Sequence, residues 1–149
     1  VHRPARQQLA GDGHLMIELP DPDCRLGRIF GSFWLPWFQP QHQHMISAQN
    51  LQKLLKTHAF EPITWHRGEA HQPADFFFIL ILFLNRLAPP ADVPWAASSS
   101  LLARSWRKAV FLCSVPFMIG ARVLDLAAAP FMRRAAWSNS FRVLARRTA

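Results

Sequence analysis

Five residues with chemically useful side chains gather in one short segment of the sequence. His42 and His44 lie two positions apart, shortly after Trp34, Trp37 and Phe38. An imidazole can accept a proton near neutral pH, so a positioned histidine can act as a general base toward a nucleophile. Large aromatic rings can clamp a flat or apolar molecule. We therefore predict two catalytic residues, His42 and His44, and a substrate-binding aromatic group, Trp34, Trp37 and Phe38.

Each of these assignments has an alternative. The two histidines could face a metal ion, although no further ligand set with suitable spacing supports a metal site, or they could form structural hydrogen bonds. The aromatic rings could instead close the core over the helix that follows them. Asp21 and Asp23 lie at a predicted strand end, where open α/β sheets bind ligands and where turns also favour Asp. Glu18, inside that strand, fits a paired or edge-facing carboxylate better than a catalytic one.

The elements that must position these residues are a strand, a long loop and a capped helix. Residues 14–19 (HLMIEL) form an apolar run between a glycine turn and Pro20, which predicts a strand buried on both faces. Residues 25–45 carry two prolines, which exclude a long helix and predict a loop. Ser47 is a good N-cap for a helix whose leucines recur at helical spacing through His58.

A second strand and an apolar insert follow. Residues 60–66 predict a strand, in which Pro62 favours the first position or a sheet edge. Residues 76–84 are apolar but fewer than the about 20 that a spanning helix needs. Residues 109–132 are interrupted by charges and prolines. Buried helices, helices on a bilayer surface, a lid and a dimer face all fit these runs. Residues 141–145 predict a last strand.

Composition and charge narrow the class of protein. With 149 residues, half of them hydrophobic, the chain can bury one domain core and is not disordered. Cys24 and Cys113 show no CxxC spacing, which suits unpaired thiols in a reducing cytoplasm. Nine basic residues and one acid lie from Ser98 onward. A basic C-terminal half of this kind fits a solvated charged face, or a surface that binds an anionic membrane or nucleic acid. Because no nucleic-acid-binding motif occurs, we expect no nucleic-acid partner.

The order of these elements resembles a known family. GDGHLMIELPDPD, an aromatic loop ending in QPQHQH and the helix SAQNLQKLLKTHAF resemble the C-terminal half of class I S-adenosylmethionine-dependent methyltransferases. In that family a glycine turn leads into the fifth strand, an aromatic loop covers the active site, and a helix ends in a Gly-Phe or Ala-Phe pair before the sixth strand. SNSFRVLARR resembles the seventh strand, which runs antiparallel between the fifth and sixth. The resemblance is good over residues 10–60 and moderate over 138–147.

The resemblance implies an α/β protein with a partial Rossmann-like methyltransferase fold. Strands five, six and seven would form a mixed sheet, with a helical insert between strands six and seven. We expect one incomplete methyltransferase domain over 1–149. It would comprise the strand, lid loop, helix and strand in 10–73, the apolar insert in 74–137, and the last strand with a basic tail in 138–149. Its partner would be a small-molecule substrate.

The departure from the family concerns the cofactor. S-adenosylmethionine binds there at a glycine-rich turn after the first strand, and an acid at the end of the second strand holds the ribose. No GxGxG occurs here, and Gly11-Asp12-Gly13 precedes a strand. Three further βα units of about 30 residues each would supply the missing half. We therefore expect a fragment, inactive alone, from an enzyme whose cofactor is S-adenosylmethionine.

A function of a different class remains open. The apolar helices and the basic C-terminal half also fit a membrane-associated binding or assembly protein, which would bind anionic lipid in a salt-dependent way. The expected location is the cytoplasm, with peripheral contact to a membrane as the second possibility. The sequence leaves the methyl acceptor and the oligomeric state open.

Overall fold

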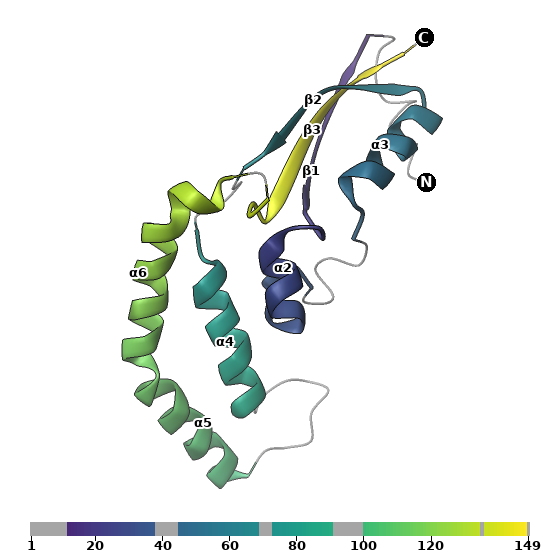
Figure 1. Ribbon diagram of the computed structural model, residues 1–149. Helices are drawn as coiled ribbons and strands as arrows, with labels where there is room; N and C mark the ends of the chain where they lie inside the picture. The colour runs from purple at the N-terminus through teal and green to yellow at the C-terminus, as the bar shows by residue number, and fades with distance from the viewer. Residues whose placement is uncertain (1–11, 38–44, 69–72, 91–99, 135, 149) are drawn as a thin grey trace. The chain divides into compact units, whose positions relative to one another are not determined.

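The chain is an α/β protein whose described residues form a three-stranded sheet and several helices (Figure 1). The computed structural model describes residues 12–37, 45–68, 73–90, 100–134 and 136–148. Its elements, in chain order, are β1 (His14–Pro20), α2 (Arg25–Phe30), the 3-10 turns η1 (Gly31–Phe33) and η2 (Leu35–Trp37), α3 (Ala48–Thr57), β2 (Phe60–Arg67), α4 (Asp75–Leu87), α5 (Leu101–Cys113), α6 (Val115–Met132) and β3 (Ser140–Arg147).

The elements fall into two compact units. The sheet unit comprises Val1–Ile29, Gln39–Gln72 and Pro130–Ala149, and therefore holds all three strands and α3. The helical unit comprises Phe30–Phe38 and Pro73–Ala129, and therefore holds the two 3-10 turns, α4, α5 and most of α6. The apolar insert expected at 74–137 thus largely coincides with the helical unit, which also includes part of the aromatic segment.

The last strand lies in the middle of the sheet. The strand order is β1-β3-β2, and β3 is antiparallel to both neighbours. Glu18, Arg142 and His66 are directly opposite one another across the three strands. The α/β class is confirmed, but the sheet differs from the expected mixed one. β1 and β2 run in the same direction without pairing, because β3 separates them, so each described strand pair is antiparallel.

One face of the sheet carries the core of this unit. Phe141, Val143 and Ala145 alternate along β3 and are fully buried, because the side chains of every second residue point to the same face. Leu51 and Leu55 of α3 pack against them, four residues apart on one helix face. The predicted start of α3 is confirmed, since Ser47 Oγ accepts a hydrogen bond from Asn50 N at 3.3 Å.

The two outer strands have one covered face each. In β1, exposed and partly buried residues alternate, and Met16 is 65% exposed. The prediction that residues 14–19 are buried on both faces is therefore wrong, because a run of apolar residues does not reveal which sheet face a helix covers. The prediction for Pro62 is confirmed, since β2 is an edge strand whose register shifts between Pro62 and Thr64.

Two segments of the chain contain more helices than the sequence predicted. The segment 25–45, expected as a loop, begins with α2, η1 and η2, so it lacks a long helix but includes short helical turns. The apolar run 109–132 lies on two helices that join at Ser114, whose backbone N–H bonds to Val110 O and Phe111 O. Pro116 is tolerated in the first turn of α6, where its missing N–H has no helical partner to lose.

Candidate functional site

Polar side chains meet at the edge of the sheet where β1 and β2 both end. Asp21 follows β1, is 1% exposed, and lies with its Oδ2 atom 3.2 Å from Nε of Arg67 at the end of β2. Its Oδ1 atom accepts a hydrogen bond from Asp23 N at 3.0 Å, which ties down the turn after the strand. A buried carboxylate is costly unless an opposite charge lies beside it, and Arg67 supplies that charge. The same ion pair holds the Arg67 guanidinium in one position.

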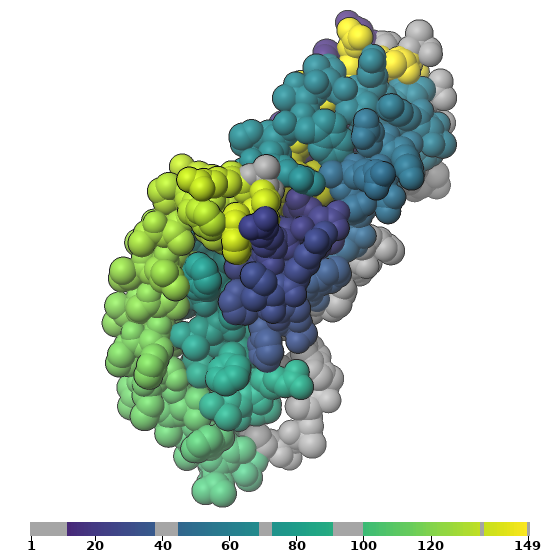
Figure 2. Space-filling view, viewed as in Figure 1, coloured from purple at the N-terminus to yellow at the C-terminus, as the bar shows by residue number. Residues whose placement is uncertain are grey.

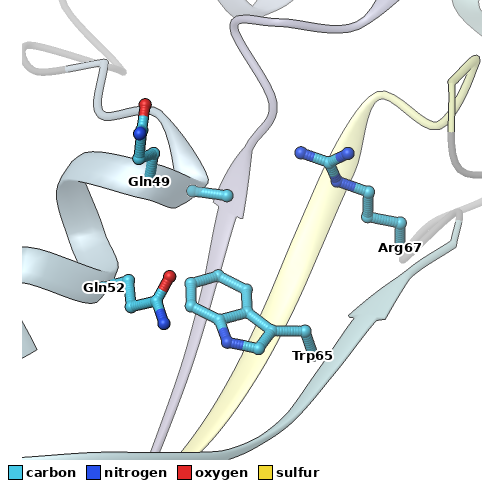
Figure 3. Close-up of a pocket in the computed structure, with 5 residues that line it drawn as sticks. Gln49, Gln52, Trp65 and Arg67 are labelled. Carbon is cyan, nitrogen blue, oxygen red and sulfur yellow. The ribbon is translucent and has the colours of Figure 1, made fainter.

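Arg67 also lines a hollow between this edge and the first turns of α3 (Figure 3). The hollow has a volume of about 470 Å³ and is lined by Ala48, Gln49, Gln52, Trp65 and Arg67. Figure 3 shows the two glutamines on α3, with the Trp65 indole between that helix and β2. The indole packs against Phe141, with ring centroids 5.7 Å apart and an interplanar angle of 51°.

The residues that line the hollow offer hydrogen-bonding and stacking groups but include no nucleophile or base. A guanidinium held by a buried carboxylate can donate to an anionic or carbonyl oxygen. The indole face can stack on a flat apolar ring, and the two amides can donate or accept. These groups suit a planar molecule with one acidic or carbonyl group. They suit a phosphate-rich molecule less well, because Arg67 is the single cation among the lining residues.

The structure describes two of the three predicted aromatic site residues and brings them into contact. Trp34 is fully buried, and Trp37 is 40% exposed, with the two ring centroids 6.0 Å apart in an edge-to-face contact. Both residues belong to the helical unit, and neither lines the hollow. Trp34 Nε1 has no hydrogen-bond partner within the part of the chain that the structure describes. Phe38, His42 and His44 lie outside the described residues, so their predicted roles stay predictions.

Other predicted polar residues take structural positions. Asp23 forms an exposed ion pair with Arg28, at 3.5 Å between Oδ1 and the guanidinium. Glu18 lies on the face of β1 away from the core and is bonded by Arg142 Nε at 2.8 Å, as expected for a paired carboxylate. Among the described residues, no group of three or more His, Cys, Asp or Glu side chains could hold a metal ion.

Sequence reasoning missed the residues that line the hollow. Gln49, Gln52 and Trp65 carried no functional signal in the sequence, and Arg67 comes directly after the strand predicted at 60–66. One signal was available: Asp21 and Arg67 are opposite charges at the ends of two predicted strands. If those strands run in the same direction on either side of a third, their ends meet at one edge, and the charges can pair.

Comparison with known proteins adds no relative to this picture. No model of a protein family matches the chain, and searches of curated proteins and of solved structures likewise found no match.

Proposed function

We propose that this chain is the C-terminal, substrate-side part of an S-adenosylmethionine-dependent methyltransferase. In this proposal it contributes to the transfer of a methyl group to a small molecule of partly hydrophobic character. The polypeptide that holds the cofactor lies outside these 149 residues, and the chain alone has no transferase activity.

The strand order carries the proposal. β3, the last strand, lies between β1 and β2 and is antiparallel to both. The resemblance of the sequence to the methyltransferases implied this insertion of the final strand between two earlier ones. A chain of three strands in sequence would more simply form a meander in which β2 is central, because consecutive strands are usually neighbours. The less common order therefore supports a partial Rossmann-like fold with strands equivalent to the fifth, seventh and sixth.

The position of α3 supports the same interpretation. It connects β1 to β2 and covers one face of the sheet with Leu51 and Leu55, as a crossover helix does. After α3 and His58 come Ala59 and Phe60, which match the Ala-Phe pair before the sixth strand. The ligand-binding hollow opens beside the first turns of this helix and the end of β2.

The described residues do not fit S-adenosylmethionine. Gly13 comes before β1 and not after a strand, so no turn of backbone N–H groups follows a strand as the cofactor requires. The buried acid of the strand edge, Asp21, is already bonded to Arg67 and to Asp23 N and cannot grip a ribose. The proposal therefore assigns to this chain the binding and orientation of the methyl acceptor, together with exclusion of water from it.

A binding experiment tests whether the cofactor binds to this chain or to the polypeptide encoded upstream of it. Isothermal titration of S-adenosylmethionine into this chain should show no tight binding. The same titration into a polypeptide that joins the chain to the reading frame encoded upstream of Val1 should show binding, and the joined protein should transfer a methyl group. Micromolar binding to the chain alone would contradict the proposal, as would an upstream frame without a GxGxG turn.

The predicted catalytic histidines are tested in that joined protein. Replacing His42 and His44 by Gln removes the imidazole base, so turnover should fall by about 10²–10⁴-fold. His66→Gln is the matched control, because His66 is exposed on β2 and does not line the hollow. Turnover that is unchanged in the His42→Gln, His44→Gln variant would remove the catalytic assignment.

The alternative function, a membrane-associated binding or assembly protein, is supported by one observation. Val115–Met132 is long and apolar enough to cross a membrane, with a mean hydropathy of 1.4, and 17% of it is buried. The two proposals separate cleanly in the experiment above, because a protein of this kind transfers no methyl group when joined to its upstream segment.

A further inference from the structure

Asp125, Arg122 and Arg107 of the helical unit bond to backbone groups at the two ends of α4. Asp125 of α6 is 2% exposed, and its two carboxylate oxygens accept hydrogen bonds from Phe76 N and Phe77 N at 2.8 and 3.0 Å. These are two of the N–H groups that the first turn of α4 leaves unpaired, so the carboxylate caps that helix. Arg122, one turn earlier on α6, donates to Pro73 O just before α4.

The other end of α4 is capped in the same way. Arg107 of α5 donates to Ala88 O, the carbonyl that follows α4, and to Asn85 Oδ1 at 2.9 Å. A cation at a helix C-terminus and an anion at its N-terminus both complement the helix dipole. Arg107 of α5 and Arg122 and Asp125 of α6 therefore lie on the faces that these helices turn toward α4.

The opposite faces of α5 and α6 are apolar and exposed. Leu101, Leu102 and Leu112 of α5 are 82%, 81% and 75% exposed, and Phe117 of α6 is 70% exposed. Leu102, Trp106, Ala109 and Cys113 recur at helical spacing, so they share one face. In the helices of a water-soluble unit the apolar stripe faces inward and the charges face water. In α5 and α6, which are drawn in green in Figure 2, large apolar side chains are instead exposed, while Arg107, Arg122 and Asp125 face α4.

We propose that the exposed faces of α5 and α6 insert into one leaflet of an anionic lipid bilayer. Charge complementarity selects this occupant. α5 contains Arg104, Arg107 and Lys108 and no acid. Arg104 and Lys108 are exposed, and Lys108, four residues before Leu112 and seven after Leu101, borders these exposed leucines. Cations at the margin of an apolar helix face bind anionic headgroups, as in helices that lie in the membrane interface. A second copy of the chain would bring the same cations together, which is unfavourable.

α5 is too short to span a bilayer, and α6 has only the minimum length for a span. With 13 residues, α5 is about 20 Å long, and the 18 residues of α6 reach about 27 Å, against about 30 Å for the hydrocarbon core. The inward position of Arg122 and Asp125 leaves the outer face of α6 free of charge. This inference does not depend on the proposed methyl transfer.

The native cysteines provide the test. Cys113 is exposed on the apolar face and Cys24 is 1% exposed, so a thiol-reactive environment-sensitive fluorophore labels Cys113 selectively. Vesicles of phosphatidylcholine with phosphatidylglycerol should shift the emission to the blue. Vesicles of phosphatidylcholine alone should give a smaller shift, and added salt should reduce the binding to the anionic vesicles several-fold.

Two pairs of substitutions make the test specific. Leu102→Glu with Leu112→Glu should lower vesicle binding, measured by sedimentation of unlabelled protein, by roughly tenfold or more. Met16→Glu with Ile63→Glu is the matched control, because these exposed apolar residues lie in the sheet unit and should leave binding unchanged. Arg104→Gln with Lys108→Gln should remove the preference for anionic vesicles without touching the apolar stripe.

Three results would overturn the inference. One is no sedimentation of the wild-type chain with anionic vesicles. Another is equal loss of binding in the Leu102→Glu, Leu112→Glu variant and its control. The last is a stable dimer, without vesicles, that the Leu102→Glu, Leu112→Glu variant abolishes, since a second copy would then be the occupant.

Discussion

Asp21 and Arg67 form the ion pair that links the strand edge to the hollow beside α3. The carboxylate is buried, whereas the guanidinium side chain remains 38% exposed. Removing Arg67 would leave a buried charge without its partner, and removing the charge of Asp21 would leave an arginine that water can still reach. Substitution of Arg67 should therefore destabilise the protein more than substitution of Asp21.

We predict that Arg67→Met lowers the free energy of unfolding by about 1–3 kcal/mol and that Asp21→Asn lowers it by less. The double variant should lose less unfolding free energy than the two single variants together, because the second substitution removes an interaction that is already lost. Urea unfolding followed by circular dichroism measures each value. Glu18→Gln is the control, since its pair with Arg142 is exposed and should contribute at most about 1 kcal/mol. Additive losses would show that the pair does not interact.

Asp125 is the second buried carboxylate with a defined task. Its two oxygens accept hydrogen bonds from backbone N–H groups in the first turn of α4. The N-cap residue itself, Ala74, has no side-chain acceptor for these groups. Asp125→Asn keeps the shape of the side chain but removes the charge and one acceptor. We predict a loss of about 1–3 kcal/mol in unfolding free energy. Asp12→Asn, at an exposed position before β1, should change it by less than about 0.5 kcal/mol. Equal effects of the two substitutions would argue against a cap.

At the scale of elements, α3 shows how local signals set boundaries. Ser47 caps its start, and its leucines place one face on the sheet. Its end is less favourable, because Ala59 follows the C-cap residue with a φ of 60°. This left-handed conformation suits glycine and is strained for residues with a Cβ atom.

We predict that Ala59→Gly raises the free energy of unfolding by about 0.5–1 kcal/mol, because glycine adopts the left-handed conformation without strain. Ala109→Gly is the control. It makes the same chemical change in the exposed middle of α5 and should lower stability by about 1 kcal/mol. Thermal unfolding of the two variants should therefore shift in opposite directions. A lower melting temperature for Ala59→Gly would contradict this account of the turn.

Element types followed from the sequence because their signals are local. The strands 14–19, 60–66 and 141–145 were predicted within two residues of their observed ends, since prolines and turns bound them. The short helical turns between Arg25 and Trp37 were not, because the prolines that exclude a long helix do not exclude a turn of helix. The burial of β1 was also mistaken, since burial depends on what packs against a strand.

At the scale of the whole molecule, the two units differ in what covers their apolar residues. In the sheet unit the core residues of β3 are fully buried beneath α3. In the helical unit, α5 has no buried residue, although its apolar face is wide. The inferred bilayer contact therefore predicts that lipid protects one unit and leaves the other unchanged.

Hydrogen exchange measured by mass spectrometry checks this prediction. Anionic vesicles should slow exchange of backbone amides in α5 and α6 by roughly tenfold or more, because insertion removes water and suppresses local opening. Peptides from β3 should exchange at the same rate with and without vesicles, since that strand already lies in the centre of the sheet. Equal slowing in both units would point to general stabilisation, and no slowing in α5 and α6 would contradict insertion.

The sequence by itself determined the kinds of elements, the cap of α3, the edge position of Pro62 and the apolar character of the insert. Periodicity, proline and capping act over a few residues, so they can be read along the chain. Only the tertiary structure decided that Asp21 meets Arg67, that Asp125 caps the start of α4 and that Arg107 bonds to its end. These contacts join residues far apart in the sequence, and they depend on strand order and helix packing, which no short segment specifies.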